Sequence, residues 1–260
     1  MQRKRLKVIV VGTTFGAYYM RALKLFPDEF EFVGIVSNGS KESKACACQY
    51  GVKMYSSIDE IPKDTDLVCV TVRTTVVGGP GTFIVQEALK RGFSVIVEAT
   101  MHYRDIEECC RIAEENKVFF KVGDMYSNLE TSSRFIEITN QIQSEFKMPL
   151  YINLKTSVQV YFSAIRLLMK SVHGIENIEI NSSVVQGPFS VITCNLYPLN
   201  IPLTIELNDE IMPGFPDAFF HLLHAMDIYY PGGRLSMTDS YGLVLWHNRM
   251  SLPKEFMRNG

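Results

Sequence analysis

Residues 6–23, with the sequence LKVIVVGTTFGAYYMRAL, constrain the fold of this chain more than any other stretch. Residues 8–11 form a continuous apolar run, which is typical of a strand buried on both faces of a parallel sheet. Gly12 ends the run and an amphipathic segment follows, so the sequence predicts a strand, a tight turn and a helix. The N–H groups at the start of such a helix lack intrahelical partners, and the helix dipole favours negative charge there. The turn is therefore a candidate site for a nucleotide pyrophosphate.

The glycine spacing of this turn matches the dinucleotide-binding pattern in part. Against Gly-x-Gly-x-x-Gly/Ala the chain has Gly12, Thr14 and Ala17, with an additional Gly16. A small hydroxyl residue thus stands where one glycine is expected. Spacing alone leaves two interpretations open, a nucleotide-binding turn or an ordinary packing unit of strand, turn and helix.

The end of the second predicted strand, residues 30–37, bears on which nucleotide would bind. An acidic residue at this place holds the ribose 2′-OH of NAD, whereas NADP needs donors for its 2′-phosphate. The chain instead has Ser37, Ser40, Lys41 and Ser43. Charge therefore favours NADP over NAD, although an ordinary polar turn would use similar residues.

Strand and helix patterns alternate through the rest of the first half. Residues 67–72, 94–98 and 118–122 are predicted strands. One predicted helix ends near residue 91 and another spans residues 103–116. With right-handed crossovers this predicts an α/β fold, a Rossmann-type doubly wound parallel sheet over residues 1–125. Its ligand lies beyond the carboxyl ends of the strands. The residues expected at that edge are Gly12, Ser37, Arg73, Glu98 and Asp124.

The pattern changes in the second half, where strands outnumber helices. Helices are expected over residues 129–143, 160–172 and 216–230, and strands near 151–156, 176–185, 189–197 and 201–207, followed by RLSMTD and GLVLWH. This predicts a smaller α+β domain over residues 126–260 that covers the cofactor. His221 and His224 would share a face of the last helix, but no third ligand is evident and their neighbours are apolar. No metal site is expected.

Composition excludes several classes of function. The chain has 260 residues, 47% of them apolar, and a net charge of −2, so neither nucleic acid nor an anionic membrane is an expected partner. No stretch reads as a signal peptide or a membrane span, and a cytoplasmic protein is expected. The six cysteines form no CxxC pair, which favours reduced thiols.

Several motifs together resemble the thiazolinyl imine reductases of siderophore biosynthesis, within the Gfo/Idh/MocA-type oxidoreductases. They are VVGTTFGAYYMRAL, VGIVSNGSKES, VTVRTTVVGGPGT, VEATMHYRD and, near the end, RLSMTDSYGLVLW. The resemblance implies a homo-oligomer that uses NADPH to reduce a thiazoline C=N to a thiazolidine. It also implies a partner, the peptidyl carrier domain of a nonribosomal peptide synthetase, which presents the substrate on phosphopantetheine.

The resemblance also assigns cofactor contacts to residues of this chain. The phosphate turn would comprise Gly12, Thr13, Thr14, Phe15 and Gly16, and the 2′-phosphate contacts Gly39, Ser40, Lys41 and Ser43. Arg73 and Thr74 would border the nicotinamide, near Glu98 at the end of the fifth strand.

Two family motifs are only partly retained. The family's Glu-His-Pro-Leu-His corresponds to Glu98, Ala99, Thr100, Met101 and His102, and its Phe-Tyr-Pro-His to Met125, Tyr126, Ser127 and Asn128. Imine reduction needs a proton on nitrogen besides a hydride on carbon, and His102 and Tyr126 are the candidate donors. Ala99 replaces the lysine of the sugar dehydrogenases, which disfavours sugar oxidation. A non-catalytic NADP-binding or scaffold protein, or a dehydrogenase of another small substrate, stays open.

Overall fold

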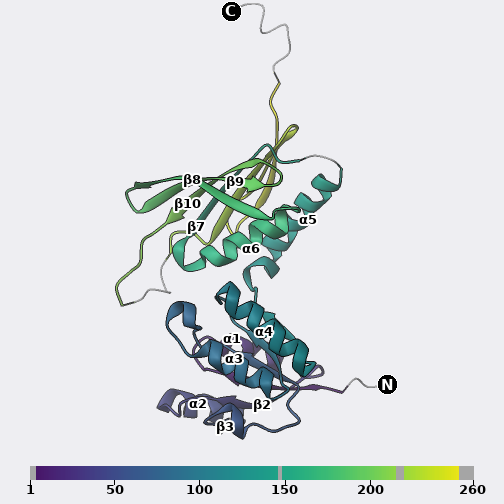
Figure 1. Cartoon of the computed structure of the whole chain (residues 1–260), viewed down its shortest axis with the longest axis vertical. Coiled ribbons are helices and arrows are strands. Elements are labelled where there is room, and N and C mark those ends of the chain that lie inside the picture. The colour runs from purple at the N-terminus through teal and green to yellow at the C-terminus, as the bar shows by residue number, and fades with distance from the viewer. Residues whose placement is uncertain (1–3, 146–147, 215–219, 252–260) are drawn as a thin grey trace, which may run out of the picture. The chain divides into compact units, whose positions relative to one another are not determined.

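A computed structural model describes residues 4–145, 148–214 and 220–251, and the chain divides into two compact units, Met1–Gly123 and Asp124–Gly260 (Figure 1). Each unit has its own sheet and its own hydrophobic core. The second unit combines a mixed sheet with helices, as expected of an α+β domain.

The first unit is a six-stranded parallel sheet flanked by helices, as predicted. Its strand order is β3-β2-β1-β4-β5-β6. The strands are β1 (Leu6–Val11), β2 (Phe30–Val36), β3 (Lys53–Tyr55), β4 (Leu67–Val70), β5 (Ser94–Val97) and β6 (Phe120–Val122). The helices are α1 (Gly16–Leu25), α2 (Lys41–Tyr50), α3 (Gly81–Lys90) and α4 (Tyr103–Asn116), with short 3₁₀ turns η1 (Ile58–Glu60) and η2 (Thr75–Val77). This order places the direction change of a doubly wound sheet between β1 and β4.

The continuous apolar run of β1 has a direct structural cause. Val8 and Val10 pack into one core cluster with Met20 of α1, whereas Ile9 and Val11 pack into another on the opposite face of the sheet. Successive side chains of a strand point to opposite faces, so a strand covered on both faces needs apolar residues at every position.

The second unit is a seven-stranded mixed sheet with two helices. Its order is β13-β12-β11-β7-β10-β9-β8, and β7 and β10 are parallel while the other neighbours are antiparallel. The strands are β7 (Tyr151–Ser157), β8 (Asn177–Gln186), β9 (Phe189–Tyr197), β10 (Ile201–Asn208), β11 (His224–Tyr230), β12 (Gly233–Met237) and β13 (Val244–Asn248). The helices are α5 (Glu130–Ser144) and α6 (Tyr161–Ser171), with 3₁₀ turns η3 (Tyr126–Asn128) and η4 (Val158–Val160).

The core of this unit lies between its helices and its sheet. Phe135 of α5 and Leu167 of α6 are fully buried against Ile152 and Leu154 of β7. Figure 1 shows both helices on the same side of the sheet.

The helix expected over residues 216–230 is wrong in its described part. Residues 224–230 form β11, which pairs with β7 and β12; residues 215–219 lie outside the described residues. Alternate residues of β11 are buried, namely His224, Met226, Ile228 and Tyr230. The apolar residues of this stretch are dense enough to fit a helical spacing as well, so only the pairing with β7 decides between the two.

Two further observations concern the chain as a whole. Among the described residues, no helix is both long enough and apolar enough to cross a membrane. All six cysteines are free, as predicted; Cys109 is buried on α4 and its neighbour Cys110 is exposed.

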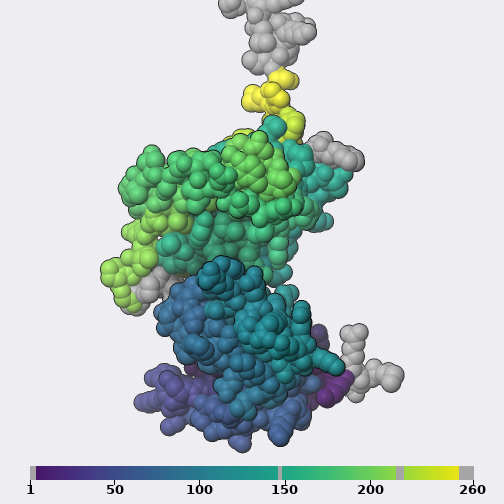
Figure 2. Space-filling model, in the orientation of Figure 1, coloured from purple at the N-terminus to yellow at the C-terminus, as the bar shows by residue number. Residues whose placement is uncertain are grey.

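The strand assignment of β11 predicts a large cost for truncating Ile228, which is 0% exposed. We expect Ile228→Ala to lower the free energy of unfolding by about 2–5 kcal/mol, since it leaves a cavity in a packed core. Chemical denaturation measures the loss. Ile180→Ala is the matched control because Ile180 is 64% exposed, and it should cost less than about 0.5 kcal/mol. Ile180 lies on β8, an edge strand of the second unit, which Figure 2 draws in space-filling form from teal through green to yellow. Equal losses in the two variants would contradict the assignment.

Candidate functional site

Five described loops of the first unit follow the carboxyl ends of parallel strands and meet at one edge of the sheet. They begin at Gly12, Ser37, Thr71, Glu98 and Gly123, directly after β1, β2, β4, β5 and β6. Ligands of doubly wound sheets bind at this edge, beside the point where the strand order changes direction.

Gly12 occupies a position that accepts no side chain. Its φ is +93°, and a Cβ built there would lie 2.9 Å from Oγ1 of Thr71. Its N–H donates to the carbonyl of Val36 at 3.0 Å, which holds the turn between β1 and β2. The backbone is therefore exposed at the turn itself, as a closely approaching phosphate requires.

Gly16 is the first residue of α1 and brings the helix against the sheet. A Cβ at Gly16 would lie 3.0 Å from Val10 Cγ1 and 3.1 Å from Thr71 Oγ1. Gly16 thus has the packing role that the third glycine of the dinucleotide pattern has, one position before Ala17. The spacing pattern alone did not identify that role.

The start of α1 is open to an anion. Phe15 stands at the N-cap, no side chain caps the helix, and its first turn has no acidic residue. Thr13, Thr14 and Phe15 form the turn before the helix, and no side-chain cap accepts from the N–H groups at the helix start. Backbone donors and the helix dipole therefore fit a pyrophosphate here.

The loop after β2 uses most of its hydroxyl groups internally. Ser40 caps α2 by accepting from the Ser43 N–H at 3.2 Å, and the Ser43 hydroxyl donates to the Ser40 carbonyl at 3.0 Å. Gly39 has a φ of +78°, and its N–H donates to Ser37 Oγ at 3.4 Å. Ser43 is buried and Lys41 is exposed. Of the predicted 2′-phosphate contacts, Lys41 is therefore the charged group that faces solvent.

The loop after β4 is shaped by glycines that surround the Arg73 carbonyl. That carbonyl accepts from the Gly81 N–H at 2.7 Å, and a Cβ at Gly79 would lie 2.2 Å from it. Thr74 is buried, and its hydroxyl donates to the Thr100 carbonyl at 2.5 Å. Thr74 therefore ties this loop to the segment after β5 and uses its hydroxyl for that purpose.

Glu98 is linked to a residue that the sequence did not single out. Tyr19 of α1 donates its hydroxyl to Oε2 of Glu98 at 2.5 Å. Burial and the Glu98 carboxylate both raise the pKa of Tyr19 far above its usual value, so the hydroxyl stays protonated. The position of Tyr19 within a helix gave no signal, because the contact depends on where α1 crosses the sheet.

His102 forms the N-cap of α4. Its Nδ1 accepts from the Arg104 N–H at 3.2 Å, and its ring lies 4.6 Å from that of Tyr103, measured between centroids. An accepting Nδ1 has no proton, so the ring proton of the capping form is on Nε2. Nδ1 of His102 is therefore occupied by the helix cap.

Tyr126 belongs to the second unit, where it packs against a buried histidine. The rings of Tyr126 and His224 meet edge to face, with centroids 4.9 Å apart. His224 Nε2 lies 3.2 Å from the Val160 carbonyl, and its Nδ1 lies 2.7 Å from Ser240 Oγ. A carbonyl only accepts, so Nε2 has the proton and Ser240 donates to Nδ1. Burial lowers the pKa of His224, which keeps the ring neutral beside Tyr126.

These contacts correct the expected pairing of the two histidines on a helix face. His224 lies on β11, and both of its ring nitrogens are hydrogen-bonded within the core. His221 is exposed and lies 2.9 Å from Glu210. Among the described residues, no three histidine, cysteine or acidic side chains are grouped as a metal site.

Asp124 anchors the turn that holds Tyr126. Its carboxylate lies 2.6 Å from Lys170 Nζ and 3.6 Å from Arg166, and it accepts from the Ser127 N–H at 3.2 Å. Burial alone would raise the pKa of Asp124, but Lys170, Ser127 and Arg166 outweigh it and hold the pKa below its usual value. Asp124 is thus an ionised anchor for η3.

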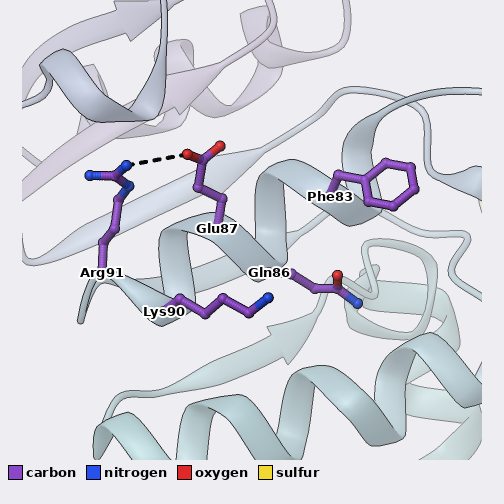
Figure 3. Close-up of a pocket in the computed structure, with 5 residues that line it drawn as sticks. All are labelled: Phe83, Gln86, Glu87, Lys90 and Arg91. Carbon is purple, nitrogen blue, oxygen red and sulfur yellow. Dashed lines mark hydrogen bonds and ion pairs between the residues drawn. The ribbon is translucent and has the colours of Figure 1, made fainter.

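A surface hollow of about 380 Å³ lies elsewhere, along the outer face of α3 (Figure 3). Its lining residues are Phe83, Gln86, Glu87 and Lys90 of α3 and Arg91 at the C-cap of that helix. Arg91 and Glu87 form an ion pair across it at 3.4 Å. None of the predicted site residues lines this hollow.

Comparison with known families matches the two units separately. Residues 6–124 match the Gfo/Idh/MocA family model, described as an oxidoreductase family with an NAD-binding Rossmann fold. Residues 147–247 match the model of the Irp3-like thiazolinyl imine reductase C-terminal domain. A search of curated protein sequences found no significant match.

Solved structures share the fold at low sequence identity. GenD2 from gentamicin A biosynthesis, in complex with NAD, has a TM-score of 0.72 at 13% identity, covering 92% of this chain and 73% of its own. The WlbA dehydrogenase from Chromobacterium violaceum, bound to NADH and UDP-GlcNAcA, has a TM-score of 0.76 at 13% identity, covering 98% and 81%. KijD10, a 3-ketoreductase from Actinomadura kijaniata in complex with NADP, has a TM-score of 0.72 at 16% identity, covering 95% and 82%.

The two family matches agree with the geometry described above. The Rossmann match spans the whole first sheet and its carboxyl edge, and the reductase match spans all seven strands of the second sheet except the last residue of β13. The chain is therefore an oxidoreductase whose first unit matches the Gfo/Idh/MocA family model and whose second unit matches the C-terminal model of the Irp3-like thiazolinyl imine reductases.

Proposed function

We propose that this oxidoreductase uses NADPH to reduce a thiazoline C=N to a thiazolidine. The match of residues 147–247 to the thiazolinyl imine reductase C-terminal domain is the observation that carries the proposal. The open start of α1 and the exposed Lys41 support it from the first unit. Bound NADPH supplies the hydride of this reaction.

The residues of the chain bind and orient the cofactor. Gly12 and Gly16 let the β1–α1 turn come close to the pyrophosphate, and the N–H groups between them hold its negative charge. Lys41 faces solvent beside the expected 2′-phosphate position. Glu98 presents a carboxylate at the end of β5.

Tyr126 is the proposed proton donor to the imine nitrogen. Its ring is oriented by the neutral His224, and its backbone turn is anchored by Asp124. His102 is the second candidate, and its Nδ1 accepts from the Arg104 N–H at the start of α4. Ala99 stands where sugar dehydrogenases have a lysine, and an alanine side chain cannot transfer a proton.

The proposal also includes a carrier for the substrate and an oligomeric state. The substrate is proposed to arrive on the phosphopantetheine arm of a peptidyl carrier domain, and the protein is proposed to act as a cytoplasmic homo-oligomer. The second candidate function is an NADP-binding protein without turnover. It is favoured by Ser127 and Asn128, which stand where the family has proline and histidine.

Turnover of a thiazoline thioester mimic tests the proposed reaction. We expect the purified chain to oxidise NADPH, followed by its absorbance, and to release the thiazolidine, identified by mass. A nucleotide sugar with oxidised cofactor serves as the comparison substrate and should give no reduction of NADP, because Ala99 cannot act as a base. NADPH binding without oxidation would overturn the proposed reaction and favour the second candidate.

Cofactor preference depends on Lys41 in this account. NADPH should bind at least about tenfold more tightly than NADH, since one charge-assisted contact supplies about 1.4 kcal/mol. Calorimetric titration measures both affinities. Lys41→Ala should remove most of the preference, whereas Lys44→Ala, an exposed lysine one turn further along α2, should keep it. An unchanged preference in Lys41→Ala would exclude the loop as the 2′-phosphate site.

The proton donor is tested by Tyr126→Phe and His102→Gln. Loss of a general acid should lower kcat by about 10²–10⁴-fold with little change in NADPH affinity. Tyr241→Phe is the control, because Tyr241 is 71% exposed in the same unit as Tyr126. A loss below about threefold in either variant removes that residue as an essential acid. In the double variant, one shared relay gives non-additive losses and independent roles give losses that multiply.

A further inference from the structure

Tyr19 is a half-buried polar residue of the first unit that the mechanism above does not use. It lies on α1, one residue after the exposed Tyr18, and its hydroxyl donates to Glu98 Oε2 at 2.5 Å. The two residues are 79 positions apart in the chain. A short bond from a half-buried hydroxyl to a carboxylate is among the stronger hydrogen bonds in proteins.

The contact joins the two halves of the doubly wound sheet. Helix α1 connects β1 to β2, on the side of the sheet order that binds the adenosine half of a dinucleotide. Glu98 follows β5, on the side that binds the other mononucleotide. The hydroxyl of Tyr19 therefore reaches across the direction change of the sheet, where the cofactor lies in such folds.

The surroundings of this bond leave little room for another arrangement. A Cβ at Gly123, directly after β6, would lie 3.1 Å from the Tyr19 hydroxyl oxygen and 3.4 Å from Glu98 Oε2. The absence of a side chain at Gly123 is what allows both groups to lie there. The backbone N–H of Glu98 donates to Val70 of β4 at 2.8 Å, so the start of the side chain is fixed as well.

We propose that Tyr19 is a positioning residue for the nicotinamide half of the cofactor, because its hydroxyl holds the Glu98 carboxylate at the carboxyl edge of β5. The fixed carboxylate then accepts from a hydroxyl or amide donor of the nicotinamide riboside. This inference rests on the proposed use of a nicotinamide dinucleotide. Tyr19 of α1 thus contributes to binding of the nicotinamide half, although α1 lies on the adenosine side of the sheet.

The test compares the whole cofactor with a fragment that lacks its nicotinamide half. NADPH and adenosine 2′,5′-bisphosphate are titrated calorimetrically into the full chain and into Tyr19→Phe. Releasing the Glu98 side chain restores its rotamer freedom, so NADPH affinity should fall roughly fivefold. Affinity for the bisphosphate should change less than about twofold, because that fragment does not reach β5.

Three further variants make the result decisive. Tyr18→Phe removes a hydroxyl from an exposed tyrosine on the same helix and should leave both affinities unchanged. Glu98→Gln should show the same selective loss of NADPH affinity as Tyr19→Phe. The double variant should lose no more than about either single variant, since the two groups act as one unit.

Equal losses for NADPH and the bisphosphate in Tyr19→Phe would overturn the inference, since they would mean that the change disturbs the phosphate turn. No loss for either ligand would overturn it as well. Failure of the unsubstituted chain to bind NADPH would be a different result, because it would overturn the proposed function together with this inference.

Discussion

The close approach of the β1–α1 turn to Thr71 is the constraint on which the first unit depends. The Thr71 hydroxyl donates to the Val11 carbonyl at 2.9 Å, and the Cα atoms of Gly12 and Gly16 both lie where a Cβ would meet its oxygen. Helix α1 can start against the sheet only because both positions are glycine. The open N–H groups of the turn, the buried face of α1 and the reach of Tyr19 to Glu98 all follow from that approach.

In the proposed function, cofactor binding and proton transfer are assigned to residues of different units. The first unit presents backbone donors, Lys41 and Glu98, which suit the charges and hydroxyls of a dinucleotide. The second unit presents Tyr126, oriented by a neutral histidine and held by an ionised aspartate. Ala99 cannot transfer a proton, so the proposed imine reduction needs an acid at another residue.

The order of strands and helices in the first unit was predictable because the central strands β1 and β4 are apolar on both faces and turn residues separate the elements. The strand β11 was not predictable, because its apolar residues fit both a helical and a strand spacing. Its pairing with β7 joins residues that are far apart in the sequence. For the same reason the sequence identified Glu98 but not Tyr19. It also could not distinguish Ser40, whose hydroxyl caps α2, or Thr74, whose hydroxyl donates to the Thr100 carbonyl, from residues whose hydroxyls face solvent.

The central claim is that the β1–α1 turn holds the pyrophosphate of a nicotinamide dinucleotide. A crystal structure of the chain with NADPH tests it most directly. We expect the pyrophosphate oxygens within hydrogen-bond distance of N–H groups between Gly12 and Gly16, with the 2′-phosphate beside Lys41. A cofactor bound elsewhere on the chain, or a turn that is empty at saturating NADPH, would contradict it.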